Sequence, residues 1–115
     1  MVKRSARITN QIFIWFVITH YIMGRRSLAE HLWGQYREEE KGDSTWLVIY
    51  DFQNSKPPTK LYDNIKRIKT FAEDGELIQF SVYMTRDQRG AKAVRDLIRH
   101  YDGQVTVFRG ELTEL

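Results

Sequence analysis

The strongest constraint on the fold is an alternation of strand-like and helix-like segments that runs from residue 46 to residue 109. Trp46 to Tyr50 form a β-branched and aromatic run of strand length. Two prolines then exclude a continuing strand, because each lacks a backbone donor, and Thr59 is the expected helix N-cap. A helix should follow, since apolar residues recur at helical spacing from Leu61 to Ala72.

The second half of the alternation repeats this order. Residues 76–85 are expected to be extended, as one bent strand or as two short strands broken near Ser81. Ala91 to Tyr101 predict a second amphipathic helix, which Gly103 should stop. Residues 104–109 alternate and predict a final strand. The order indicates an α+β sandwich with two helices on one face of an antiparallel sheet.

The first 45 residues predict a mainly helical N-terminal extension, with the sandwich domain spanning residues 46–115. Ser27 and Glu30 form a capping box, so a helix should begin there. Leu28, Leu32 and Tyr36 fall on one stripe of it, and its end is expected between residues 38 and 41.

The most apolar segment, Ile12 to Met23, is too short to span a membrane, which takes about 20 residues. No signal-peptide cleavage site follows it. We expect a buried element or a dimer contact, with a membrane-surface anchor as the alternative. The 115 residues include no cysteine, which excludes disulfides and thiolate metal sites. We therefore expect a soluble protein of the cytoplasm.

Charge is distributed unevenly along the chain. The net charge is +3, and the first 26 residues carry five basic side chains and no acidic one. From residue 46 onward, eleven basic residues stand against ten acidic ones, so a basic surface must come from placement on one face. The two predicted helices from this region each carry basic residues toward their polar sides. These residues could follow a phosphate backbone, or simply face solvent. They are Lys60, Lys66, Arg67, Lys69, Arg89, Lys92, Arg95 and Arg99.

Asp51 is the acidic residue that stands out, because it ends the most hydrophobic predicted strand. Mg²⁺ often takes one or two carboxylates together with water and phosphate, so two copies of Asp51 in a symmetric dimer could form a site. The alternative is that Asp51 starts the loop by hydrogen bonding to its own backbone. No histidine pair has metal-ligand spacing, and no glycine-rich phosphate loop is present in the sequence.

The segments WLVIYD (residues 46–51) and LIQFSVY (residues 77–83) resemble the small CRISPR-associated adaptation protein, the partner of the CRISPR integrase. The resemblance implies a ferredoxin-like βαββαβ fold and a homodimer in which residues 109–115 add to the partner's sheet. It implies an antiviral function, and it places Asp51 at the aspartate assigned to Mg²⁺-dependent phosphodiester cleavage. Ser81 matches the serine of the second motif.

The sequence departs from the family in three places. Phe52 to Asn54 follow Asp51, where the family often has another acid and basic residues. Met84 follows the second motif, where an acid is common. The first 45 residues have no counterpart in the minimal family domain, and they are an extension, a further partner-binding element or a misassigned start.

Three functions remain open on these grounds. The first is a dimeric CRISPR adaptation subunit that binds DNA or RNA and scaffolds the integrase during spacer acquisition. The second is a Mg²⁺-dependent endonuclease of the same fold, a hydrolase with Asp51 as metal ligand and catalytic residue. The third is a transcriptional regulator, in which residues 9–23 and 28–39 form a reduced helix-turn-helix.

Overall fold

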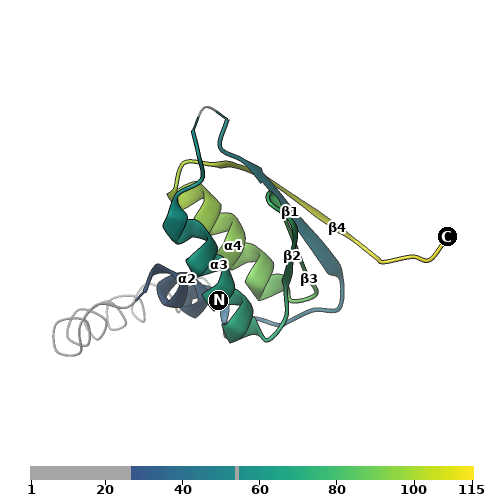
Figure 1. Cartoon of the computed structure of the whole chain (residues 1–115). Helices are drawn as coiled ribbons and strands as arrows, with labels where there is room; N and C mark the ends of the chain where they lie inside the picture. Colours follow the sequence, from purple (N-terminus) through teal and green to yellow (C-terminus); the bar gives the residue numbers. More distant parts are fainter. Residues whose placement is uncertain (1–26, 54) are drawn as a thin grey trace.

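The computed structural model describes residues 27–53 and 55–115. The expectations for Ile12 to Met23, and for the rest of the first 26 residues, lie outside this part. In the described part, three helices and four strands follow one another (Figure 1). They are α2 (Leu28–Tyr36), β1 (Thr45–Asp51), α3 (Thr59–Ala72), β2 (Glu76–Gln79), β3 (Val82–Thr85), α4 (Gln88–His100) and β4 (Gln104–Gly110).

The four strands form one antiparallel sheet with the order β2-β3-β1-β4. Residues 76–85 are therefore two strands, which was one of the two alternatives predicted, and Phe80 and Ser81 connect them. Figure 1 shows the helices together on one face of the sheet. The predicted α+β architecture is thus confirmed. Within the described part, no helix is both long and apolar enough to cross a membrane.

The two faces of the sheet differ in what covers them. Val48 and Tyr50 of β1 are buried beneath the helices, as is Tyr83 of β3. The alternate residues face the other way, because successive side chains of a strand point to opposite faces. Cross-strand pairing places Leu47 of β1 between Met84 and Phe108 on that open face.

Helix α2 shares the core of the sheet domain. Ala29 and Leu32 are buried in the same apolar cluster as the inner residues of α3 and α4. The Ala29 N–H also donates a hydrogen bond of 3.1 Å to the Asn64 side-chain oxygen on α3. A buried polar group needs such a partner, so Asn64 connects α2 to α3 by more than apolar contact.

The helix ends agree only in part with the predictions. The Ser27 hydroxyl accepts a hydrogen bond from the Glu30 N–H, as the capping box requires. Helix α2 ends at Tyr36, before the predicted range. The prediction of Thr59 as an N-cap was wrong: Pro58 holds that position and offers no side-chain cap, and Thr59 is the first residue of α3. The ring of Pro58 already supplies the extended backbone that precedes a helix.

Candidate nucleic-acid interface

Helix α3 carries four cations on its outer side. Its apolar residues fall on one buried stripe, on the side that packs against α2 and α4, which leaves the basic residues to solvent. Lys60, Lys66, Arg67 and Lys69 are all exposed. Among residues 27–53 and 55–115, the ion pairs present involve none of these four side chains. Their charge is therefore available to a partner outside the chain.

Arg89 on α4 is held within the fold. Its guanidinium forms hydrogen bonds of 2.7 and 2.9 Å with the carboxylate of Asp87, which is fully buried. The same group donates to the Arg37 carbonyl oxygen at 3.0 Å and lies 4.9 Å from the centre of the Trp33 ring. The hydrogen bonds to Asp87 raise the pKa of Arg89 despite partial burial. The contacts of Arg89 thus connect α2 and the residue after it to the start of α4.

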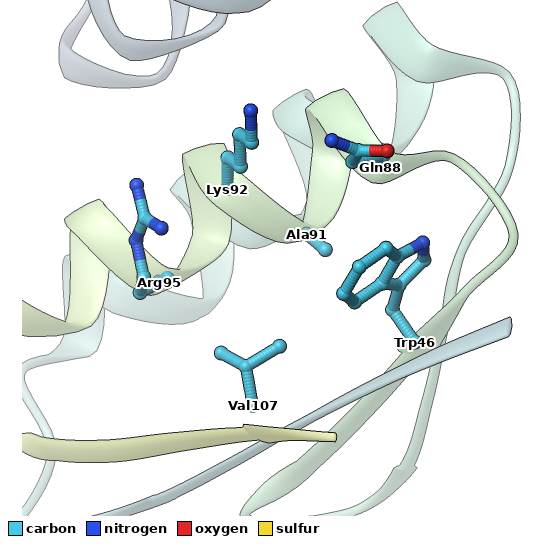
Figure 2. A pocket seen from close by; sticks show the side chains of 6 residues that line it. All are labelled: Trp46, Gln88, Ala91, Lys92, Arg95 and Val107. Carbon is cyan, nitrogen blue, oxygen red and sulfur yellow. The ribbon is translucent and has the colours of Figure 1, made fainter. Parts of the chain in front are cut away.

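Lys92 and Arg95 also make intramolecular contacts. The Lys92 ammonium lies 2.7 Å from the Glu39 carboxylate. Arg95 pairs with Asp96 at 2.9 Å and donates to the Tyr36 hydroxyl at 3.1 Å. Figure 2 shows both side chains along α4 with their charged ends pointing away from the strands.

The eight predicted nucleic-acid-binding residues therefore form two groups with different surroundings. The four cations of α3, with Arg99 near the end of α4, are exposed. The remaining three, Arg89, Lys92 and Arg95, are partly buried against acids and aromatic rings. All eight lie on α3 and α4, and the five exposed ones are the four of α3 together with Arg99.

Asp51 lies at the carboxyl end of β1 and is exposed. One of its carboxylate oxygens accepts a hydrogen bond of 3.1 Å from the Gln53 N–H. This is the loop-starting contact that the sequence analysis gave as the alternative. Gln53 has a positive φ of 37°, so the chain turns sharply here. In the sheet register Asp51 alternates with Tyr50 and shares the open face with Ile49.

A shallow hollow opens beside Asp51, at the end of β1. Tyr50 and Tyr62 both donate hydrogen bonds to the Phe80 carbonyl oxygen, at 2.7 and 3.2 Å. Burial, followed by the neighbouring Tyr62, raises the pKa of the Tyr50 phenol, so this group stays protonated and continues to donate. The hollow is lined by Tyr50, Asp51, Phe52, Ser55, Pro57, Tyr62, Phe80 and Ser81.

At this position the described part of a single chain does not supply a full set of protein ligands for a metal ion. Among the described residues, no group of three or more His, Cys, Asp or Glu side chains gathers. Asp51 alone offers one carboxylate, and one of its oxygens already bonds to the backbone. A Mg²⁺ ion bound here by one Asp51 carboxylate would take its other ligands from water and phosphate, and the Asp51 of a second copy would add another carboxylate.

Only one of the two segments predicted to form a helix-turn-helix lies in the described part of the chain. Residues 9–23 lie outside the described part. Residues 28–39 contain α2, which packs against both α3 and α4 through Ala29 and Leu32.

Three residues of this region were not predicted from the sequence. Asp87 caps α4 and accepts from the Arg89 N–H; its position before an amphipathic pattern was a usable N-cap signal. The contact of Asn64 with α2 had no sequence signal, since the partner is 35 residues away. Phe80 is 85% exposed, at the connection within a segment that was predicted only as extended chain.

No family model, curated protein sequence or solved structure matches the chain.

Proposed function

We propose that this protein is a nucleic-acid-binding subunit that contacts the phosphate backbone through helix α3. The observation that carries the proposal is the contrast between the two helices. The α3 cations are exposed without an intramolecular ion partner among the described residues, whereas three cations of α4 are already paired. Each cation that neutralises a phosphate releases counterions, so such binding must weaken with salt.

Replacing three α3 cations tests this proposal. Lys66→Gln, Arg67→Gln and Lys69→Gln combined should weaken duplex DNA binding and flatten its salt dependence, by roughly 0.9 in log–log slope per lost contact. The measurement is fluorescence anisotropy across a salt series. A matched control removes the same charge from exposed positions outside α3: Arg37→Gln, Arg86→Gln and Arg109→Gln. Binding that does not depend on salt, or equal losses in both variants, would contradict the proposal.

The role that we propose within this class is that of a dimeric CRISPR adaptation subunit. The motif resemblance suggests it, and the strand order β4-β1-β3-β2, with α3 and α4 as the two connecting helices, supports a ferredoxin-like arrangement. The open sheet face supports the dimer, because Leu47, Met84 and Phe108 adjoin there. An integrase subunit is the partner that this role requires.

Cleavage at Asp51 is the second candidate activity. It is favoured by the exposed carboxylate at the rim of a hollow and on the open face of the sheet, where two copies could meet. Asp51→Asn tests it, because the amide oxygen can still accept from the Gln53 N–H and the turn should persist. We expect Mg²⁺-dependent cleavage of RNA or DNA to be abolished with unchanged circular dichroism. Equal cleavage by both proteins would refute it.

A further inference from the structure

Phe80 is the large apolar side chain whose position is hardest to explain by folding. Its ring is 85% exposed at the connection between β2 and β3. Only Leu115, at the end of the chain, is more exposed among the large apolar residues of the described part. An exposed ring contributes little hydrophobic stabilisation, so packing among the described residues does not explain the phenylalanine.

The backbone at Phe80 and Ser81 is nevertheless fixed by hydrogen bonds. The Phe80 carbonyl oxygen accepts from two tyrosine hydroxyls, on β1 and α3 respectively. The next residue, Ser81, accepts a 3.0 Å hydrogen bond from the Tyr50 N–H through its own carbonyl oxygen. An exposed ring on a fixed backbone is preorganised for a flat ligand, since little freedom remains to be lost on binding.

The residues around the ring favour one class of flat ligand. Phe80 lines the hollow together with Tyr62 and Asp51. The exposed cations Lys56 and Lys60 are close in sequence to Pro57 and Tyr62, which also line it. Aromatic rings beside cations are the combination that binds single-stranded nucleic acid, with bases on the rings and phosphates on the cations. Duplex DNA keeps its bases stacked and offers no such face.

We propose that Phe80 is a stacking platform for an unpaired base, so that the hollow beside Asp51 binds single-stranded nucleic acid. This inference rests on the proposed nucleic-acid-binding function and adds a substrate class to it. The α3 cations serve any phosphate backbone, whereas Phe80 distinguishes a single strand from a duplex.

The test compares binding of a deoxythymidine homopolymer and a DNA duplex of equal length. Phe80→Ala should weaken single-strand binding by roughly 5- to 100-fold and leave duplex binding unchanged. Phe80→Trp should restore it, because it returns an aromatic face. Ile78→Ala is the matched control, since it removes an exposed apolar side chain from the adjoining strand β2 without removing a ring. Light scattering follows the oligomeric state of each variant.

The outcomes separate the two proposals. If Phe80→Ala leaves both single-strand binding and duplex binding intact, the stacking site alone is overturned. A change of mass in Phe80→Ala would also overturn it, by making Phe80 a protein interface residue. Failure of the wild-type protein to bind either probe would overturn both this inference and the proposed function.

Discussion

At the scale of single residues, the same side-chain type has different roles on neighbouring helices. Arg67 on α3 is exposed, while Arg89 on α4 lies between a buried carboxylate and an indole ring. Removing one partner of a buried ion pair leaves an uncompensated charge, which is costly, whereas removing an exposed cation changes stability little. Loss of binding after an Arg89 substitution would therefore reflect the fold as much as the ligand.

Asp74 provides a prediction about pH at this scale. Burial alone would raise its pKa, but hydrogen bonds from the Arg86 N–H and the Thr85 hydroxyl, with the charges of Lys41 and Arg86, outweigh burial and lower it. A carboxyl whose pKa is lower in the folded state stabilises the fold at neutral pH. That contribution is lost as the pH falls from the ordinary carboxyl range through the lowered pKa.

We therefore expect Asp74→Asn to reduce the free energy of unfolding by about 1–2 kcal/mol at neutral pH. The difference from wild type should shrink in acid, because protonated aspartate resembles asparagine. Urea unfolding at a series of pH values measures both quantities. A difference that stays constant with pH would contradict the assigned role of the charge.

At the scale of elements, α2 belongs to the same core as the sheet domain. The hydrogen bond between Ala29 and Asn64, the burial of Leu32 and the stacking of Trp33 on Phe71 join it to α3. Removing residues 1–44 would strip these contacts and expose apolar surface on α3 and α4. Such a deletion tests folding as well as the regulatory hypothesis.

Gly34 gives a prediction about the stability of α2. It is exposed within the helix, and a Cβ placed there would have no neighbour within 4 Å. Gly34→Ala should therefore raise the free energy of unfolding by about 0.5–1 kcal/mol, because alanine restricts the unfolded chain. The control is Gly75→Ala: there φ is +136° and a Cβ would collide with the Tyr83 hydroxyl oxygen. This variant should be destabilised in urea, and stabilisation of both or neither would contradict the argument.

At the scale of the whole molecule, the helices cover one face of the sheet and leave the other open (Figure 1). Phe108 is 54% exposed there, beside Leu47. Beyond β4, residues 111–115 have no regular secondary structure, and Leu112 and Leu115 are exposed. The proposed dimer would cover this apolar face, and the tail would be free to pair with the partner's sheet.

Placing a charge on this face tests the dimer. Phe108→Glu should convert a dimer to a monomer, because burying an unpaired carboxylate in an apolar interface is costly. Phe71→Glu makes the same substitution on α3, where the proposed dimer has no contact, and should keep the dimer mass. Light scattering measures both. A wild-type protein that is monomeric would refute the dimer itself, and a Phe108→Glu protein that stays dimeric would place its interface elsewhere.

The sequence by itself determined the alternation of strand-like and helix-like segments after residue 46 and the capping of α2 at Ser27, and it offered the local turn at Asp51 as one of two alternatives. These depend on periodicity, on caps and on contacts a few residues apart, all of which the sequence displays. Only the tertiary structure decided which cations of α3 and α4 are available, and that α2 joins the core. Glu39 lies 53 residues from Lys92, and Ala29 lies 35 residues from Asn64. Spacing along a helix shows which residues share a face, but what covers that face depends on how the chain folds back upon itself.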